Sequence, residues 1–114
     1  MTIEKFEDIK AWQKAREMTL FIYSVFGNNK DFRFRDQVQS ASVSVMNNIA
    51  EGFERKSDKA FSNFLYIAKG SCSEVKSMTY LALDLKYISE KDSTKILTMS
   101  SEISRMLFGL IKTL

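Results

Sequence analysis

The stretch QVQSASVSVMNNIAEG, residues 37–52, decides the fold of this chain. Apolar and small residues recur in it every three or four positions, which is the spacing of one face of an α-helix. With the residue one turn upstream, this face consists of Phe34, Val38, Ala41, Val45, Ile49 and Gly52. The stretch FLYIAKGSCSEV, residues 64–75, has the same character. We therefore expect two helices that pack closely against each other.

The helix that contains residues 37–52 has a second apolar stripe, displaced around the helix from the first. Its members are Val43, Met46, Ala50 and Phe53. Together the two stripes make an apolar surface wider than one core face requires. Such a helix is either central to its own domain or covered by another subunit. We take the second stripe as the candidate interface between copies of the chain.

The rest of the chain predicts three more helices, separated by short turns. Helical spacing of apolar residues covers residues 8–26, a long segment from about 58 to 87, and residues from about 90 to the last apolar position at 114. Asp31, Ser57 and Ser89 are the expected N-caps of the later helices. Gly27 and the two asparagines after it are expected to end the first helix in the left-handed conformation.

Four helices joined by short turns predict an all-α fold, an up-down-up-down antiparallel four-helix bundle that forms one domain over residues 1–114. If the second and third helices fold back at Lys56, residues 40–42 lie across from residues 70–72, and Val38 lies near Glu74. Small residues such as Gly70 would then meet small residues and let the two helix axes approach closely.

Composition excludes several classes of function. The 114 residues include no proline, four scattered glycines, one cysteine and no histidine. Nucleophile–histidine pairs, histidine-based metal sites and glycine-rich phosphate loops are therefore absent. We expect no catalytic site, no cofactor and no metal. Cys72 is expected to be a small buried residue, which together with the lack of a signal segment or membrane span predicts a cytoplasmic protein.

Two carboxylates and an asparagine stand among uncharged neighbours in the paired helices. An enzymatic hypothesis would have to use Glu51 or Glu74 as an acid or base. The alternative is structural: Glu51 meets Arg55 one turn later, and Glu74 meets Gln37 or a lysine across the helix pair. Asn48, a poor helix former in mid-helix, is expected to bond across an interface or to face solvent, with a nucleic-acid or partner contact as the alternative.

Basic residues gather at both ends of the expected bundle. The net charge of +3 and a pI near 9.0 are compatible with nucleic-acid binding without requiring it. The candidate nucleic-acid contacts are Arg33 and Arg35 at one end and Arg55, Lys56 and Lys59 at the other. Acidic residues accompany both groups, so a solvated surface of mixed charge is the alternative interpretation.

Three segments of this sequence resemble a known family. They are DIKAWQKA at residues 8–15, the second helix with NIAEG at residues 48–52, and FSNFLYIAKGSCSE at residues 61–74. Together they look like the bacterial four-helix-bundle proteins encoded in intervening sequences of 23S rRNA genes. The likeness spans roughly residues 6–88, and the last helix matches only by pattern. The chain departs from the relatives at Gln39 and Ser40, where they often carry arginines.

The resemblance implies a homopentameric ring of four-helix bundles. It also implies a relationship to the accessory protein of diversity-generating retroelements, which binds nucleic acid and a reverse transcriptase. We therefore expect a non-enzymatic homo-oligomeric scaffold that binds RNA or a nucleic-acid-handling protein. The alternative is an adaptor that contacts only proteins, of the retroelement accessory type or a toxin–antitoxin-like type.

Overall fold

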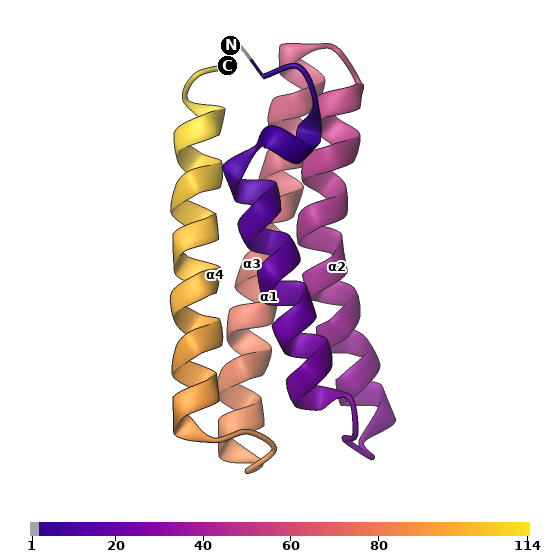
Figure 1. The fold of residues 1–114 in the computed structure, drawn as a ribbon, viewed down its shortest axis with the longest axis vertical. Coiled ribbons are helices and arrows are strands. Elements are labelled where there is room, and N and C mark those ends of the chain that lie inside the picture. The colour runs from indigo at the N-terminus through magenta and orange to yellow at the C-terminus, as the bar shows by residue number, and fades with distance from the viewer. Residues whose placement is uncertain (1–2) are drawn as a thin grey trace.

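The computed structural model describes residues 3–114, which form four α-helices preceded by a short 3-10 helix (Figure 1). The elements are η1 (Phe6–Asp8), α1 (Lys10–Phe26), α2 (Phe32–Glu54), α3 (Asp58–Asp84) and α4 (Glu90–Ile111). Consecutive helices run in opposite directions (Figure 1). The prediction of an all-α bundle of four helices is confirmed.

Each helix packs against two neighbours. α1 contacts α2 and α4, and α3 contacts the same two helices from the other side of the bundle. In Figure 1, α1 therefore lies in front and α3 behind it. The bundle measures 43 Å along its axis and 21 by 19 Å across.

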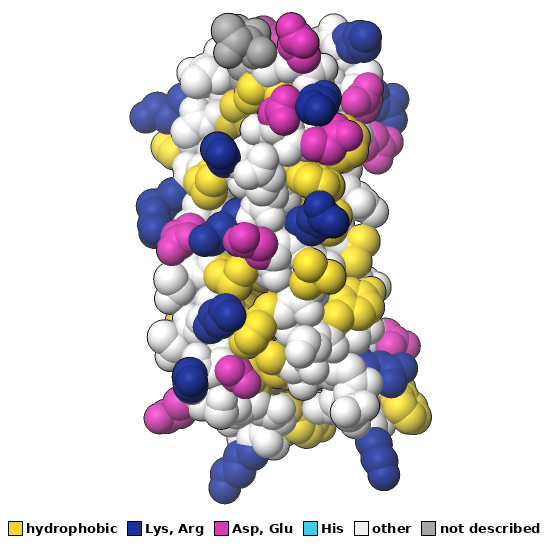
Figure 2. All heavy atoms as spheres, in the orientation of Figure 1, with side chains coloured by type: hydrophobic (Ala, Val, Ile, Leu, Met, Phe, Trp, Pro, Cys, Tyr) yellow, Lys and Arg dark blue, Asp and Glu magenta, His cyan; other side chains and the backbone are white. Residues whose placement is uncertain are grey.

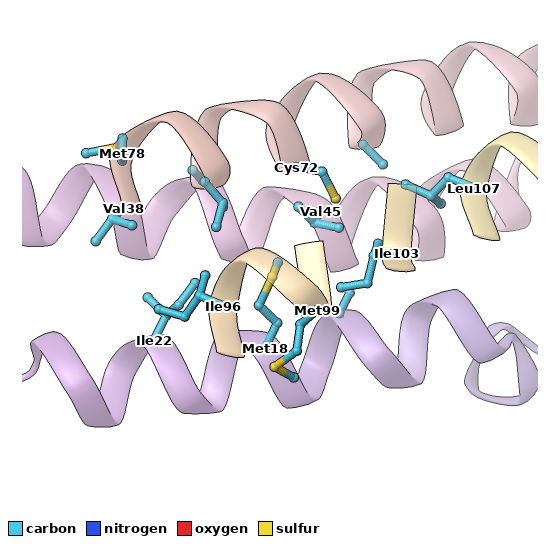
Figure 3. Packing of buried hydrophobic residues seen from close by; sticks show 14 of the residues in the cluster. Met18, Ile22, Val38, Val45, Cys72, Met78, Ile96, Met99, Ile103 and Leu107 are labelled. Atoms are coloured by element: carbon cyan, nitrogen blue, oxygen red, sulfur yellow. The ribbon is translucent and has the colours of Figure 1, made fainter. Parts of the chain in front are cut away.

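The core is built from the predicted apolar stripes of all four helices, whose side chains meet along the bundle axis (Figure 3). All six residues of the first stripe of α2 are buried. Trp12 is half-buried and makes an edge-to-face contact with Phe6, with ring centroids 5.1 Å apart. Leu85 lies within the segment predicted as the third helix, but it follows the last residue of α3 and is 46% exposed.

The N-termini of α2, α3 and α4 are capped as the sequence predicts. Oδ1 of Asp31 accepts a hydrogen bond from the Phe34 amide at 3.2 Å. Ser57 caps α3 at 3.3 Å and Ser89 caps α4 at 3.1 Å, each through its Oγ. These bonds satisfy backbone donors that the first turn of a helix leaves unpaired.

The C-termini differ from the prediction. Gly27 keeps the right-handed helical conformation, with φ −58° and ψ −32°, so the expected left-handed ending of α1 is wrong. The left-handed residues are instead Lys56, with φ 60°, and Lys86, with φ 61°. The Tyr87 amide donates to the Ala82 carbonyl at 2.8 Å and the Lys86 amide to the Leu83 carbonyl at 3.1 Å. This paired pattern ends α3 without a glycine.

The hairpin of α2 and α3 has nearly the predicted register. Nε2 of Gln37 donates to Oε2 of Glu74 at 3.4 Å, and about two turns further along α2 the Ser44 hydroxyl lies 2.9 Å from that of Ser71. The two helices lie close together at Gly52, where an added Cβ would be 2.5 Å from Cβ of Phe64.

The small residues expected at the centre of this hairpin do not all meet there. Gly70 is exposed, and no atom lies within 4 Å of where its Cβ would be, so its predicted place in the close contact is wrong. Ser42 faces α1 instead, where its carbonyl accepts a hydrogen bond of 3.1 Å from the Thr19 hydroxyl. The small residues of α2 therefore do not all face α3: Ser44 contacts α3, and Ser42 contacts α1.

Within residues 3–114, no helix combines the length and apolar content needed to cross a membrane.

Candidate nucleic-acid interface

The basic residues singled out in the sequence lie in two separate groups. Arg33 and Arg35 are in the first turn of α2, while Arg55, Lys56 and Lys59 surround the turn between α2 and α3 at the other end of the bundle (Figure 1). Two of them are paired with acids: Arg35 with Asp36 at 3.2 Å and Arg55 with Glu51 at 2.8 Å. One chain therefore does not bring these five residues into one patch.

Of the polar residues singled out in α2, Glu51 bonds the expected partner, whereas Asn48 bonds within its own helix and neither crosses an interface nor faces solvent. Glu51 accepts from Arg55 at 2.8 Å, as the spacing of four residues suggests. Asn48 Nδ2 donates to the carbonyl and the hydroxyl of Ser44, at 2.8 and 3.0 Å, and the Ser44 hydroxyl contacts that of Ser71 on α3. Asn48 thus orients a serine that bridges the two helices.

The second apolar stripe of α2 is only partly available to another chain. Met46 and Phe53 pack against the core of their own chain, and Phe53 makes an edge-to-face contact with Phe61, with centroids 5.7 Å apart. Val43 and Ala50 are half-buried and lie outside that cluster. The packing of η1 and α1 against α2 accounts for part of the wide apolar surface.

Larger exposed apolar side chains lie on α3. Ile67 is 52% and Leu81 46% exposed, and both are seven residues from Glu74, so the three form one line along the helix. Glu74 contacts Gln37, which places this line beside α2. One chain therefore leaves both apolar side chains open to solvent.

On its other side, α3 forms a groove with α4. Two adjoining depressions share Lys76, Ser101 and Arg105, and together they make what we call the α3/α4 groove. Its lining residues are Cys72, Ser73, Lys76, Tyr80, Thr94, Leu97, Thr98, Ser100, Ser101, Ser104 and Arg105. At one end, Nζ of Lys69 donates to Oγ of Ser104 at 3.2 Å.

The α3/α4 groove is positively charged, because the acids of its two helices lie elsewhere. Between the terminal turns, α3 has one acidic residue, Glu74, which faces α2. Beyond its first turn α4 has only Glu102, which pairs with Lys14 of α1 at 3.2 Å. None of the ion pairs among residues 3–114 includes Lys69, Lys76 or Arg105.

Aromatic side chains stand at the edges of the same groove. Tyr80 is 51% exposed and lines it, and Phe108, 47% exposed, lies beside Lys69 near its other end. Tyr66 is 53% exposed and lies one turn before Lys69 on α3. The ammonium groups of Lys69 and Lys112 lie 5.4 and 5.3 Å from the centroid of the Phe108 ring. The groove thus combines cationic side chains with aromatic side chains.

The floor of the groove includes Cys72, which has no chemistry to offer there. Burial raises the pKa of its thiol to about 12, although nearby Lys69 acts in the opposite direction. A thiol with such a pKa is neutral at physiological pH and a poor nucleophile. Its carbonyl accepts a hydrogen bond of 3.0 Å from the buried Ser100 hydroxyl. Cys72 is therefore part of the packing between α3 and α4, as the sequence suggests.

The opposite face of the bundle has a different character. Figure 2 shows α1 with its neighbours α2 and α4, and there Lys and Arg side chains are interspersed with Asp and Glu, with hydrophobic side chains between them. Lys14 illustrates this, since it pairs with both Glu17 and Glu102. No group of acidic or cysteine side chains suited to a metal ion occurs within the described part of the chain.

The α3/α4 groove was not predicted, although the sequence contains a signal for it. Lys69, Ser73, Lys76 and Tyr80 are spaced by four, three and four residues, and so are Ser101, Arg105, Phe108 and Lys112. Each set lies along one line of a helix. The sequence does not show how α3 and α4 are aligned, and this alignment brings the two sets of residues together.

Comparison with known proteins places this fold in a family. The model of a family called 23S rRNA-intervening sequence protein matches residues 7–109. A crystal structure of a protein with unknown function from the S23 ribosomal protein family of Bacteroides thetaiotaomicron is similar, with a TM-score of 0.83 and 26% sequence identity. The match covers 90% of this chain and 98% of that one. No curated protein matches the sequence.

Proposed function

The chain belongs to the 23S rRNA-intervening sequence protein family, and we propose that it is a non-enzymatic, homo-oligomeric scaffold that binds RNA. The observation that carries the proposal is the set of cations in the α3/α4 groove that no acid neutralises. Phosphate contacts dominate the affinity of proteins for nucleic acids, and such contacts need lysines and arginines that are free to make them. Lys76 and Arg105 meet this condition better than the paired Arg35 and Arg55.

Self-association is supported by apolar side chains that one chain leaves exposed. Ile67 and Leu81 on α3, with Val43 and Ala50 on the outer side of α2, would be covered by a neighbouring copy. We propose the homopentameric ring that the sequence resemblance implies. The formal charge of that ring would be five times the +3 of one chain, which strengthens attraction to RNA.

Light scattering on the purified protein tests the assembly. A pentamer is expected for the wild type, and Ile67→Glu is expected to weaken it, because a charge would be buried at the contact. Ser24→Glu, at an exposed position of α1, is the matched control. A monomeric wild-type protein at micromolar concentration would refute the oligomer.

A non-enzymatic role is supported by the surroundings of the two carboxylates once considered for acid–base chemistry. Glu51 and Glu74 are exposed and bonded to Arg55 and Gln37. Neither lines the α3/α4 groove. Replacement of both by Gln is expected to leave RNA binding unchanged.

RNA binding itself is tested by measuring affinity for structured and unstructured RNA at two salt concentrations. We expect affinity to fall steeply as salt rises, because phosphate contacts release counterions. Absence of any binding at low salt would refute the RNA-binding role.

A second candidate function is that of a protein adaptor of the reverse-transcriptase accessory type, without direct contact to nucleic acid. The exposed Ile67, Leu81 and Leu85 favour it, since an apolar surface of this kind also suits a different protein. The adaptor role would be supported instead if the purified protein binds no RNA and a pull-down from nuclease-treated extract recovers one fixed protein partner.

A further inference from the structure

We propose that the α3/α4 groove binds single-stranded RNA, with Lys69, Lys76 and Arg105 on the phosphates and Tyr66, Tyr80 and Phe108 as surfaces on which bases stack. The inference rests on the proposed RNA-binding function and assigns to it a site and a form of RNA. No residue predicted from the sequence as a nucleic-acid contact belongs to this site.

Charge and length suit an extended strand. Tyr66 and Tyr80 are 14 residues apart on α3, which at about 1.5 Å per residue separates them by about 21 Å. Lys69, Ser73 and Lys76 lie between them on the side that faces α4. A strand laid along the groove would therefore meet an aromatic ring near each end and cations in between.

The aromatic residues distinguish a single strand from a duplex. Stacking on a side chain requires a base whose face is free, and the bases of a duplex are already stacked on each other. Tyr66 and Tyr80 are each about half exposed, so their rings are open to such contacts. Phe108 is also about half exposed, but Lys69 and Lys112 lie over its ring, so a base would stack there only after displacing one of these lysines. Proteins that bind single strands combine a positively charged groove with aromatic stacking surfaces in this way.

The hydroxyl groups of the groove favour RNA over DNA. Ser73, Ser101, Thr94 and Thr98 line it, and none of these side chains is bonded within the described part of the chain. A serine or threonine hydroxyl both donates and accepts hydrogen bonds, as does the ribose 2′-hydroxyl that DNA lacks. Of the residues proposed for assembly, Val43 and Ala50 lie on α2, and Ile67 and Leu81 lie on the line of α3 that includes Glu74, which contacts α2 and not α4.

Fluorescence anisotropy with a labelled unstructured RNA oligomer, its duplex, and the DNA of the same sequence tests the inference on the full chain. Wild-type protein is expected to prefer the single-stranded RNA. Lys76→Ala combined with Arg105→Ala removes two phosphate contacts. The negative slope of log affinity against log salt is therefore expected to become shallower by about 1.4. Tyr66→Leu combined with Tyr80→Leu is expected to weaken binding at least about fivefold at constant charge.

The matched control is Lys5→Ala combined with Lys10→Ala, which removes the same charge from exposed positions outside the groove. It is expected to bind RNA nearly as the wild type does. Circular dichroism and light scattering verify that every variant keeps its fold and assembly.

Equal loss in the control and groove variants, or equal affinity for duplex RNA or for DNA, would overturn the inference. RNA binding that survives both groove variants would overturn the site and leave the proposed function standing. A wild-type protein that binds no RNA at low salt would refute both.

Discussion

The hydroxyl of Tyr87 donates a hydrogen bond of 2.8 Å to Oδ2 of Asp31. The two residues are 56 positions apart, and the bond joins a residue in the turn after α3 to the residue that caps α2. The Tyr87 ring also packs edge-to-face on Phe34, with centroids 5.3 Å apart. One aromatic residue thus fixes the relative positions of two turns at the same end of the bundle.

This bond predicts a pH-dependent effect of Tyr87→Phe. The hydrogen bond from Tyr87, followed by that from the Phe34 amide, lowers the pKa of Asp31 below 3.8. The stabilisation is therefore present above pH 3.8 and is lost as the pH falls through the lower pKa of the folded state. Tyr87→Phe is expected to reduce the melting temperature at pH 7, and the difference from the wild type is expected to shrink in acid.

Thermal melts at neutral and acidic pH measure this effect. Tyr80→Phe removes an exposed hydroxyl and is expected to change nothing at either pH. Equal melting temperatures for Tyr87→Phe and the wild type at pH 7 would show that the bond contributes no stability.

Gly52 and Gly70 are expected to respond in opposite directions to alanine. A Cβ at position 52 would lie 2.5 Å from Cβ of Phe64, so Gly52→Ala must push α2 and α3 apart and cost about 1–3 kcal/mol. Gly70 faces open space, where alanine favours the helix by up to about 1 kcal/mol. Urea unfolding at one protein concentration compares the two, and a Gly52→Ala variant as stable as the wild type would contradict the close contact.

Lys86→Gly is expected to stabilise the protein. Lys86 has φ 61°, a conformation that disfavours side chains with a Cβ and that glycine adopts freely. The expected gain is about 0.5–1 kcal/mol after the larger entropy of glycine in the unfolded chain is subtracted. Lys86→Ala removes the same charge but keeps the Cβ, so chemical denaturation should show no gain for it. A similar gain in both variants would point to the charge instead.

Cys72 is expected to make the protein sensitive to alkali. Burial raises the pKa of its thiol from 9.0 to about 12, so the folded state holds a proton that the unfolded state releases. Its contribution is constant below pH 9 and falls by about 1.4 kcal/mol per pH unit between pH 9 and about 12. Unfolding free energies over this range should decline more steeply for the wild type than for Cys72→Ala; parallel curves would argue against a buried neutral thiol.

Much of the fold could be predicted because it depends on local patterns. The stripe from Phe34 to Gly52 and the caps at Asp31, Ser57 and Ser89 are all where the sequence places them. The end of α3 could not be predicted, since it depends on a lysine in a conformation usually taken by glycine. The left-handed conformation predicted for Gly27 was wrong because glycine adopts the right-handed conformation equally well.

The candidate site was harder to predict because it depends on how two helices meet. The predicted basic residues lie at the two ends of the bundle, as expected, but none of them lines the α3/α4 groove. Lys76 and Arg105 are 29 positions apart in sequence and share one groove because α3 and α4 are antiparallel neighbours. Part of the second apolar stripe is covered by its own chain, which the pattern of α2 alone does not reveal.

The described chain starts and finishes at the same end of the bundle (Figure 1), where Ile3 and Thr113 line one depression. The order in which the chain connects the four helices could therefore be changed without changing how they pack. A short linker across that end, with a new opening between Gly27 and Lys30, would give a circular permutant that begins with α2 and finishes with α1. Each helix would keep both of its neighbours, so the turn between α1 and α2 is a connection that the packing itself does not need.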